Sequence, residues 1–136
     1  MLMLIIILPL ALKSFAPEHR TIILANAPKE QPYEAIFKAV CVTESNFDAD
    51  AYNSKENAVG IAQIRSIRIR DYNQRTGDNF TLSQMFDPDK AKIVFMYYAC
   101  KFHPSDYEKI ARSWNGSGPM TVIYWNKVNN QLKNTK

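Results

Sequence analysis

Glu44 is the residue whose type and position point most directly to chemistry. It lies 11 residues after Tyr33, and on a helix that many steps of about 100° return to within about 20° of the same direction. The carboxyl therefore continues a stripe of apolar side chains, formed by Tyr33, Ile36, Phe37, Val40 and Cys41. Burial there would raise its pKa, and a carboxyl protonated near neutral pH is what general acid catalysis needs. The alternative is an ordinary glutamate facing solvent at a helix end.

The segments around Glu44 show helical periodicity. Residues 33–44 form one predicted helix, and the polar stretch 45–59 lacks any period and is predicted to be a loop. We find no convincing strand pattern, so the fold class is predicted to be a single, mostly α domain. Start and end signals for further helices are Gly77 after residues 66–75, capping boxes at Thr81-Leu82-Ser83-Gln84 and Ser105-Asp106-Tyr107-Glu108, the N-terminal signal Asp87-Pro88, and Pro119.

Composition limits the classes of protein to consider. Of 136 residues, 46% are hydrophobic and 22% charged, which are ordinary values for one compact globular domain. A formal net charge of +4 suits an anionic polymer such as cell wall or nucleic acid, without selecting either. Two Cys and two His provide no ligand set for structural zinc, so we expect no metal and no cofactor. We expect Cys41 and Cys100 to be buried thiols that are not joined to each other.

The N-terminus predicts export. Residues 1–12 are apolar without interruption, but a helix of that length covers about 18 Å, short of a hydrocarbon core of roughly 30 Å. A secretory signal fits this length better. We predict a signal peptide over residues 1–16, with cleavage as late as residue 27, and a domain over residues 28–136 that works in the periplasm or cell envelope. The alternatives are an uncleaved anchor, which would keep the protein at a membrane, and a buried N-terminal helix.

Four short motifs occur in order along the chain. They are Glu44-Ser45, Gly60-Ile61-Ala62-Gln63, Asp87-Pro88 followed by Tyr98, and Ala111-Arg112-Ser113-Trp114-Asn115-Gly116. In this order they resemble the lytic transglycosylase (SLT) family of the lysozyme-like superfamily, over roughly residues 33–118. The resemblance implies a single lysozyme-like helical domain. It also implies cleavage of the β-1,4 bond between N-acetylmuramic acid and N-acetylglucosamine in peptidoglycan.

The resemblance implies roles for particular residues. Glu44 would be the single catalytic acid and base, and Tyr98 would orient its carboxyl. The remaining residues would form the substrate cleft, with Ser45 near the acetamido group or the carboxyl, Gly60 allowing a close backbone approach, and Gln63, Trp114 and Asn115 lining the walls. The chain departs from the family pattern in having Ala62 where Met is common and Trp114 where Tyr is common. Each of these residues also has a structural reading, as a turn glycine, a core aromatic or a helix cap.

The number of available acids bears on the reaction. Between Glu44 and Gln63 the acids are Asp48, Asp50 and Glu56, and no pattern in the polar stretch would bury or orient them. Asp48 is the best candidate for a second carboxylate. With Glu44 alone, the resemblance implies that the sugar's own C6 hydroxyl attacks and that the product is a 1,6-anhydro sugar. The alternatives are hydrolysis, as in goose-type lysozyme, and peptidoglycan binding or assembly without turnover.

A basic cluster suggests a different class of partner. Arg65, Arg68, Arg70 and Arg75 lie in one stretch that could contact phosphates. Their spacing of 3, 2 and 5 residues places them on more than one side of a helix. We therefore predict no nucleic-acid partner and expect the partner to be peptidoglycan glycan strands.

Overall fold

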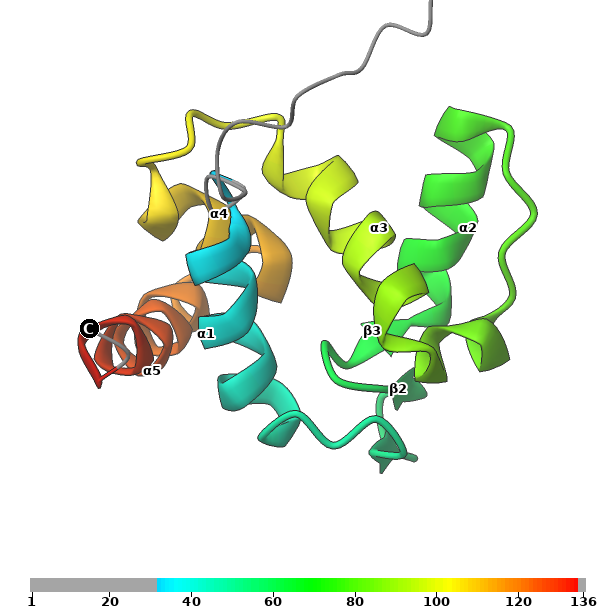
Figure 1. Cartoon of the computed structure of the whole chain (residues 1–136), viewed down its shortest axis with the longest axis horizontal. Helices are drawn as coiled ribbons and strands as arrows, with labels where there is room; N and C mark the ends of the chain where they lie inside the picture. Colours follow the sequence, from blue (N-terminus) through cyan, green and yellow to red (C-terminus); the bar gives the residue numbers. More distant parts are fainter. Residues whose placement is uncertain (1–31, 135–136) are drawn as a thin grey trace, which may run out of the picture.

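The computed structural model describes residues 32–134, and within this range the chain is mostly helical (Figure 1). The α-helices are α1 (Glu34–Ser45), α2 (Ser66–Thr76), α3 (Pro88–Ala99), α4 (Tyr107–Asn115) and α5 (Met120–Asn134). A 3-10 helix, η1, covers Leu82–Phe86, and the strands are β1 (Tyr52–Asn53), β2 (Ala58–Val59) and β3 (Ile64–Arg65). The prediction of a mostly α domain is confirmed.

Local signals explain several helix boundaries. The Asp87 carboxylate accepts hydrogen bonds from two backbone N–H groups at the start of α3, where Pro88 takes the first helical position. Helix α2 ends at Gly77, whose φ of +82° suits glycine. The Gln84 side chain accepts a hydrogen bond from the Thr81 backbone at 2.9 Å, which completes the capping box before η1. These predicted starts and ends are confirmed.

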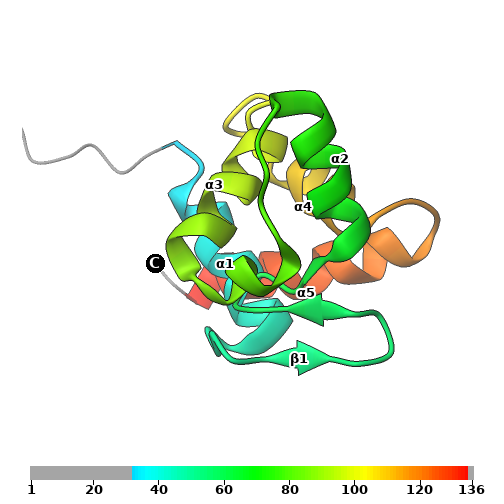
Figure 2. The ribbon, with the colours of Figure 1, turned by 90° about the vertical axis from the view of Figure 1, so that its right-hand side faces the viewer.

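Three short strands show that part of the predicted loop was assigned wrongly. They form an antiparallel sheet in the order β1-β2-β3, with Tyr52 opposite Val59 and Val59 opposite Ile64. Each strand has only two residues, too few for an alternation of apolar and polar side chains to be visible in the sequence. Figure 2 shows this sheet along one edge of the molecule, beside α1 and α5.

Helix α4 begins differently from the prediction. The capping box expected from Ser105 to Glu108 was wrong, because the helix starts at Tyr107 and no side chain caps its N-terminus. Ser105 lies ahead of the N-cap, and its Oγ is 2.7 Å from Nδ1 of His103 within the connecting turn. The buried face of α4 follows the apolar periodicity and consists of Ile110, Ala111 and Trp114.

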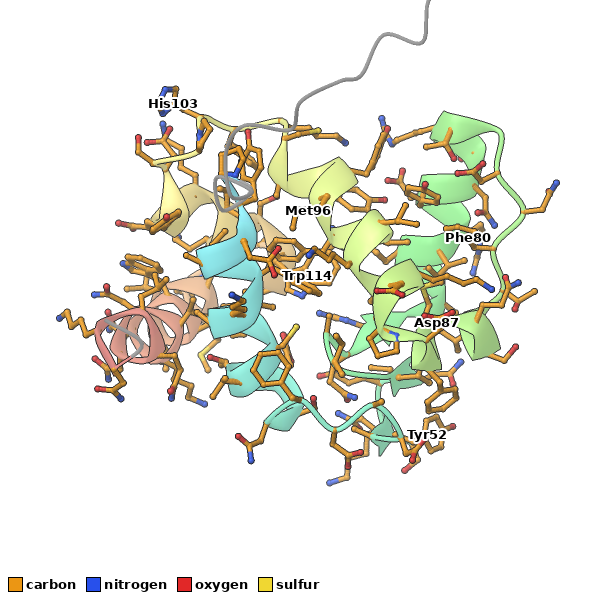
Figure 3. All side chains as sticks on the ribbon, viewed as in Figure 1. Tyr52, Phe80, Asp87, Met96, His103 and Trp114 are labelled. Carbon is orange, nitrogen blue, oxygen red and sulfur yellow. The ribbon has the colours of Figure 1, made fainter. Side chains whose placement is uncertain are left out.

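The elements form two groups with α3 between them. Helices α1, α4 and α5 pack together, while α2, η1 and the sheet lie on the other side, and α3 contacts members of both groups (Figure 1). The core follows this arrangement. The Phe95 ring of α3 lies 5.0 Å from the Phe37 ring of α1 and 4.9 Å from the Trp114 ring of α4, between centroids. Trp114 lies near the middle of the molecule (Figure 3).

The two cysteines differ in environment. Both are free thiols, as predicted, and Cys41 is buried on α1. The predicted burial of Cys100 was wrong, because α3 ends at Ala99 and Cys100 follows as an exposed C-cap residue. Its thiol donates a hydrogen bond to the Tyr97 carbonyl oxygen at 3.1 Å.

The predicted signal peptide over residues 1–16, its later cleavage at residue 27 and the start of the domain at residue 28 all lie outside the described residues. Within residues 32–134, no helix has both the length and the apolar character needed to cross a membrane.

Candidate active site

Glu44 lies at the C-terminal end of α1, beside a cavity of about 440 Å³. The apolar stripe that leads to it is buried, as the periodicity predicted, and Glu44 itself is partly buried. The helix stops one residue later. Asn46 adopts a left-handed conformation with a φ of +56°, and its backbone N–H returns to carbonyl oxygens of the last turn. This ending leaves the carboxyl at the junction of α1 and the sheet.

The cavity has two unlike walls. One comes from the ends of α1 and α5, with Glu44, Tyr124 and Lys127. The other comes from the sheet and the start of α2, while the end of α4 closes one side. The complete lining is Thr43, Glu44, Asn53, Glu56, Gln63, Ile64, Arg65, Arg68, Trp114, Asn115, Met120, Tyr124 and Lys127.

The environment of Glu44 favours the protonated carboxyl. Burial raises its pKa from 4.5 to about 7, and this effect outweighs the hydrogen bond from Tyr124, which acts in the opposite direction. The Tyr124 hydroxyl donates to Oε1 of Glu44 at 2.8 Å. The charge of Arg65 also lowers the pKa of Glu44, and that of Glu56 raises it. A carboxyl with a pKa near 7 has both protonation states available at neutral pH, which suits a group that must give and then take a proton.

Two arginines, from β3 and the start of α2, hold the end of α4 by hydrogen bonds. Arg65 donates to the Asn115 carbonyl oxygen at 2.9 Å, and Arg68 donates to that of Trp114 at 2.7 Å. The Arg68 guanidinium lies 4.6 Å from the Tyr98 ring centroid and 4.7 Å from that of Trp114, between the two rings. The Trp114 indole N–H donates to the carbonyl oxygen of buried Ala62 at 3.3 Å. These bonds connect residues that are far apart in sequence and form the closed side of the cavity.

Gln63, Trp114 and Asn115 all line the cavity, where the resemblance placed them. Gln63 has a φ of +48°, an uncommon conformation for a residue with a side chain. Its amide nitrogen donates to the carbonyl oxygens of Ala51 and Gly60 at 3.3 and 3.1 Å, so the amide is held in a fixed position. Their contact with substrate stays a prediction.

Ser45 and Gly60 do not line the cavity. The Ser45 hydroxyl donates to the Ile61 carbonyl oxygen at 2.9 Å, so it ties the end of α1 to the segment after the sheet's second strand. Gly60 has a φ of +74°, and a Cβ there would overlap the Met85 carbonyl. Its close backbone approach is therefore to η1, and both residues have structural roles in place of the expected contact with substrate.

The predicted contact between Tyr98 and the Glu44 carboxyl was wrong. The Tyr98 hydroxyl donates to Oδ2 of Asp71 at 2.6 Å, and Tyr98 lines a neighbouring cavity of about 380 Å³ with Arg68 and Asp71. Trp114 and the Arg68 guanidinium lie between Tyr98 and the cavity beside Glu44. Tyr98 therefore supports the scaffold and does not orient the acid.

Tyr124 is the candidate site residue that the sequence did not indicate. It shares a helix face with Val128 and Leu132, so its periodicity indicates a core position, and its ring is indeed buried. Only its hydroxyl reaches Glu44, from 80 residues further along the chain. The available signal was a tyrosine on an apolar stripe, where the hydroxyl of a buried ring needs a hydrogen-bond partner.

Glu56, and not Asp48, is the second carboxylate beside Glu44. Glu56 lines the cavity from the turn between β1 and β2, and its carboxylate lies 3.6 Å from Nε of Arg65. Asp48 is exposed and uses its carboxylate to accept the backbone N–H of Asp50 at 3.0 Å, a turn bond. The preference for Asp48 as the second acid was therefore wrong.

No metal-binding group is found in the part of the chain that the structure describes, where no three His, Cys, Asp or Glu side chains cluster suitably. The arrangement that remains is the Glu44 carboxyl, which accepts a hydrogen bond from Tyr124, in a polar cavity with the arginine-paired Glu56. Such a group can act as a general acid and then as a general base.

Comparisons with known proteins agree with this chemistry. The family model described as the transglycosylase SLT domain matches residues 21–134. Neither the curated proteins nor the solved structures contain a significant match to the chain.

Proposed function

Because this chain belongs to the family of transglycosylase SLT domains, we propose that it is a lytic transglycosylase of peptidoglycan. Its substrate bond is the β-1,4 bond between N-acetylmuramic acid and N-acetylglucosamine, and its product carries a 1,6-anhydro ring. The observation that carries the proposal is the Glu44 carboxyl, which lies beside a polar cavity, accepts one tyrosine hydrogen bond and has a pKa near 7.

In the first step, Glu44 gives its proton to the glycosidic oxygen. The bond from that oxygen to C1 of the muramic acid breaks, and the N-acetylglucosamine leaves with a free hydroxyl at C4. The carbonyl oxygen of the 2-acetamido group supplies electrons to C1, as in substrate-assisted glycosidases. Glu44 is now ionised, and the hydrogen bond from Tyr124 at 2.8 Å stabilises this anion.

In the second step, the Glu44 carboxylate takes the proton from the C6 hydroxyl. The C6 oxygen attacks C1 and displaces the acetamido oxygen, which closes the 1,6-anhydro ring and restores the protonated carboxyl. The hydroxyl competes well with water because it is tethered to the reacting ring. Its effective molarity is about 10⁵ M or more when well oriented, against about 55 M for unactivated water.

Neutral side chains suit the binding of the sugar rings. Asn53 and Asn115 line the cavity with amides, which can both donate to and accept from acetamido and hydroxyl groups. Gln63 offers its carbonyl oxygen as an acceptor, because its amide nitrogen already donates to the Ala51 and Gly60 carbonyl oxygens. Trp114 also lines it, although only 6% of its surface is exposed. We assign these four residues to substrate binding.

Hydrolysis is the second candidate function, and the position of Glu56 is the observation that favours it. A carboxylate on the wall opposite Glu44 could activate water, as in glycosidases that use two acids. Arg65 counters this role, because its guanidinium lies 3.6 Å from the Glu56 carboxylate and competes with a water molecule for the carboxylate oxygens. We therefore assign Glu56 to the electrostatics of the site and keep Glu44 as the single acid and base.

The products of digestion test the reaction. Purified peptidoglycan is digested with the wild-type protein, Glu56→Gln and Asp48→Asn, and the soluble fragments are weighed by mass spectrometry. All three should release fragments that end in 1,6-anhydro-N-acetylmuramic acid, lighter by one water than hydrolysis products. Reducing ends, together with loss of turnover in Glu56→Gln, would make the protein a two-carboxylate hydrolase. Binding without any release of fragments would make it a peptidoglycan-binding or assembly protein.

The proposed substrate also sets where the protein works. Peptidoglycan lies outside the cytoplasm, and the apolar residues 1–12 support export by a signal peptide or retention by an uncleaved anchor. We propose a periplasmic or envelope-associated enzyme. Mass measurement of the protein purified from the envelope would distinguish cleavage after residue 16, cleavage after residue 27 and an intact leader.

A further inference from the structure

The cations that line the cavity differ in what holds them. Arg65 and Arg68 both donate to carbonyl oxygens at the end of α4, and Arg65 also pairs with Glu56. Lys127, on α5, is exposed and has neither a hydrogen bond nor an ion pair with any residue that the structure describes. Its charge acts on Glu44, whose pKa it lowers. Lys127 is thus the lining cation that is available to a ligand.

Lys127 belongs to a ridge on α5 that borders the cavity. Met120, Tyr124 and Lys127 follow one another at steps of four and three residues, so they share one side of the helix, and all three line the cavity. Ile123 lies beside them. Met120 and Ile123 are 65% and 50% exposed, although apolar side chains of this size are more often buried. The ridge therefore offers apolar surface and one positive charge beside the catalytic carboxyl.

The opposite wall offers a different surface. It contributes the Asn53 amide and the Gln63 carbonyl oxygen, and its Glu56 and Arg65 pair with each other. Its other cation, Arg68, donates to the Trp114 carbonyl oxygen and lies over the rings of Tyr98 and Trp114. That wall suits uncharged sugar groups, because both of its arginines already have partners in the protein. An anionic part of a substrate would therefore be favoured on the α5 side.

On the basis of the proposed function, we infer that the α5 ridge of Met120, Ile123 and Lys127 binds the acidic peptide stem of the muramoyl residue. The stem is attached through the lactyl group at C3 of the sugar whose C1 reacts, so it leaves the cavity close to Glu44. Lys127 pairs with a carboxylate of the stem, and the two apolar side chains contact its alanyl methyl groups. The enzyme therefore prefers glycan strands that carry stems over bare strands.

The test compares glycan strands that carry stems with strands in which a lactyl carboxylate, left by hydrolysis of the lactyl–alanyl amide, stands in place of each stem. Intact glycan strands and strands stripped of peptides by an amidase are each digested by four proteins: the wild type, Lys127→Ala, Lys127→Glu and Lys127→Arg. For each protein, kcat/KM on intact strands is divided by kcat/KM on stripped strands. Lys127→Ala should lower this ratio about fivefold, the upper range for an exposed charge pair, Lys127→Glu more, and Lys127→Arg should restore it. Any effect of the charge on Glu44 itself acts on both substrates and cancels in the ratio. Lys133→Glu, on the same helix but outside the cavity lining, should leave the ratio unchanged.

A ratio that stays constant across the Lys127 variants, or a wild type that does not distinguish the two substrates, would overturn the inference. A second measurement separates this outcome from a failure of the proposed reaction. Binding of disaccharide fragments with and without the stem is measured to the Glu44→Gln protein and to the same protein with Lys127→Glu. The stem should strengthen binding to the first protein and not to the second, at low salt more than at high salt. This result does not depend on turnover.

Discussion

Two regions of this molecule contain the same pair of groups with opposite results. In the cavity beside Glu44, the Tyr124 hydroxyl donates to the Glu44 carboxyl at 2.8 Å, and the pKa of Glu44 is raised to about 7. Behind Trp114, the Tyr98 hydroxyl donates to the Asp71 carboxyl at 2.6 Å, and the pKa of Asp71 is lowered. A tyrosine beside a carboxyl does not by itself make a catalytic acid.

The difference lies in what surrounds each carboxyl. Both hydrogen bonds favour the ionised form, since they are donated to it. Asp71 has 38% of its side chain exposed and also accepts from Arg75 at 2.8 Å, so the hydrogen bonds prevail. Glu44 lies on the inner side of α1, where the cost of burying a charge exceeds the gain from Tyr124. Burial can shift a carboxyl pKa by as much as about 3 to 5 units, more than one hydrogen bond returns.

The largest expected effect is on activity, when each carboxyl is replaced by its amide. Glu44→Gln keeps the shape of the side chain and an oxygen that accepts from Tyr124, but it has no proton to give. Turnover of peptidoglycan should fall by about 10²–10⁴-fold, the usual contribution of general acid catalysis. The matched variant Asp71→Asn should retain turnover within about threefold, because Asp71 lies outside the cavity lining. If Glu44→Gln and Asp71→Asn both folded and lost turnover equally, the two carboxyls would not differ in function.

The same replacements should change stability with opposite signs. The pKa of Glu44 is about 7 in the folded chain and 4.5 as its reference, so the folded state binds more protons between these values and the free energy of unfolding falls as pH rises through them. Glu44→Gln removes this loss and should stabilise the protein at pH 8 by about 3 kcal/mol, with most of the gain gone near pH 5. The pKa of Asp71 is lowered, so the ionised carboxylate adds to the free energy of unfolding at neutral pH, and this addition is lost on acidification. Asp71→Asn should therefore slightly destabilise the protein at pH 8.

Urea denaturation of both variants and the wild type at pH 5 and pH 8 measures these changes. The sign is the decisive quantity, since a catalytic acid held in a costly environment should gain stability on neutralisation. A Glu44→Gln protein that is less stable than the wild type at pH 8 would mean that burial of Glu44 is not the dominant influence on its pKa.

Features that depend on local sequence could be predicted, and features that depend on contacts between distant segments could not. The helices were predictable because their periodicity and caps are local, as at Asp87 and Gly77. Glu44 was predictable because it continues the stripe of its own helix. The small sheet was not, because two-residue strands carry no readable pattern and form only when the chain returns on itself.

The residues around Glu44 are placed by contacts between distant segments. The hydrogen bond to Glu44 was expected from Tyr98 but is made by Tyr124, since periodicity places both rings in the core and cannot tell which hydroxyl meets a carboxyl 80 residues away. Glu56 was ranked below Asp48 for a similar reason. Its place in the cavity is set by the turn between β1 and β2, while Asp48 only closes a local turn. Packing of α5 on α1 and the path of the sheet supplied this information.

A smaller effect should separate the two tyrosines. Tyr124→Phe removes the donor that stabilises ionised Glu44, so the pKa of Glu44 should rise, and the alkaline limb of kcat/KM should move upward by about one pH unit. Tyr98→Phe should leave that limb in place and lower stability by about 1 kcal/mol through the lost bond to Asp71. If Tyr98→Phe moved the limb as far as Tyr124→Phe, the two regions would be coupled through Trp114.

The smallest effect on activity is expected from alkylation of the thiols. Like the two carboxyls, one thiol is buried and the other is exposed. Cys41 lies one turn before Glu44 on the buried face of α1, and burial, followed by the charge of Glu44, raises its pKa to about 12. Cys100 is exposed at the end of α3. Since the thiolate is the reactive form, iodoacetamide at pH 8 should modify Cys100 alone in the native protein and both thiols in urea.

Mass spectrometry counts the adducts, and the singly modified protein should digest peptidoglycan at the rate of the unmodified protein, because Cys100 is outside the cavity lining. Rapid native modification of Cys41 would show that the inner side of α1 admits solvent, and the high pKa of its neighbour Glu44 would then lose its physical cause.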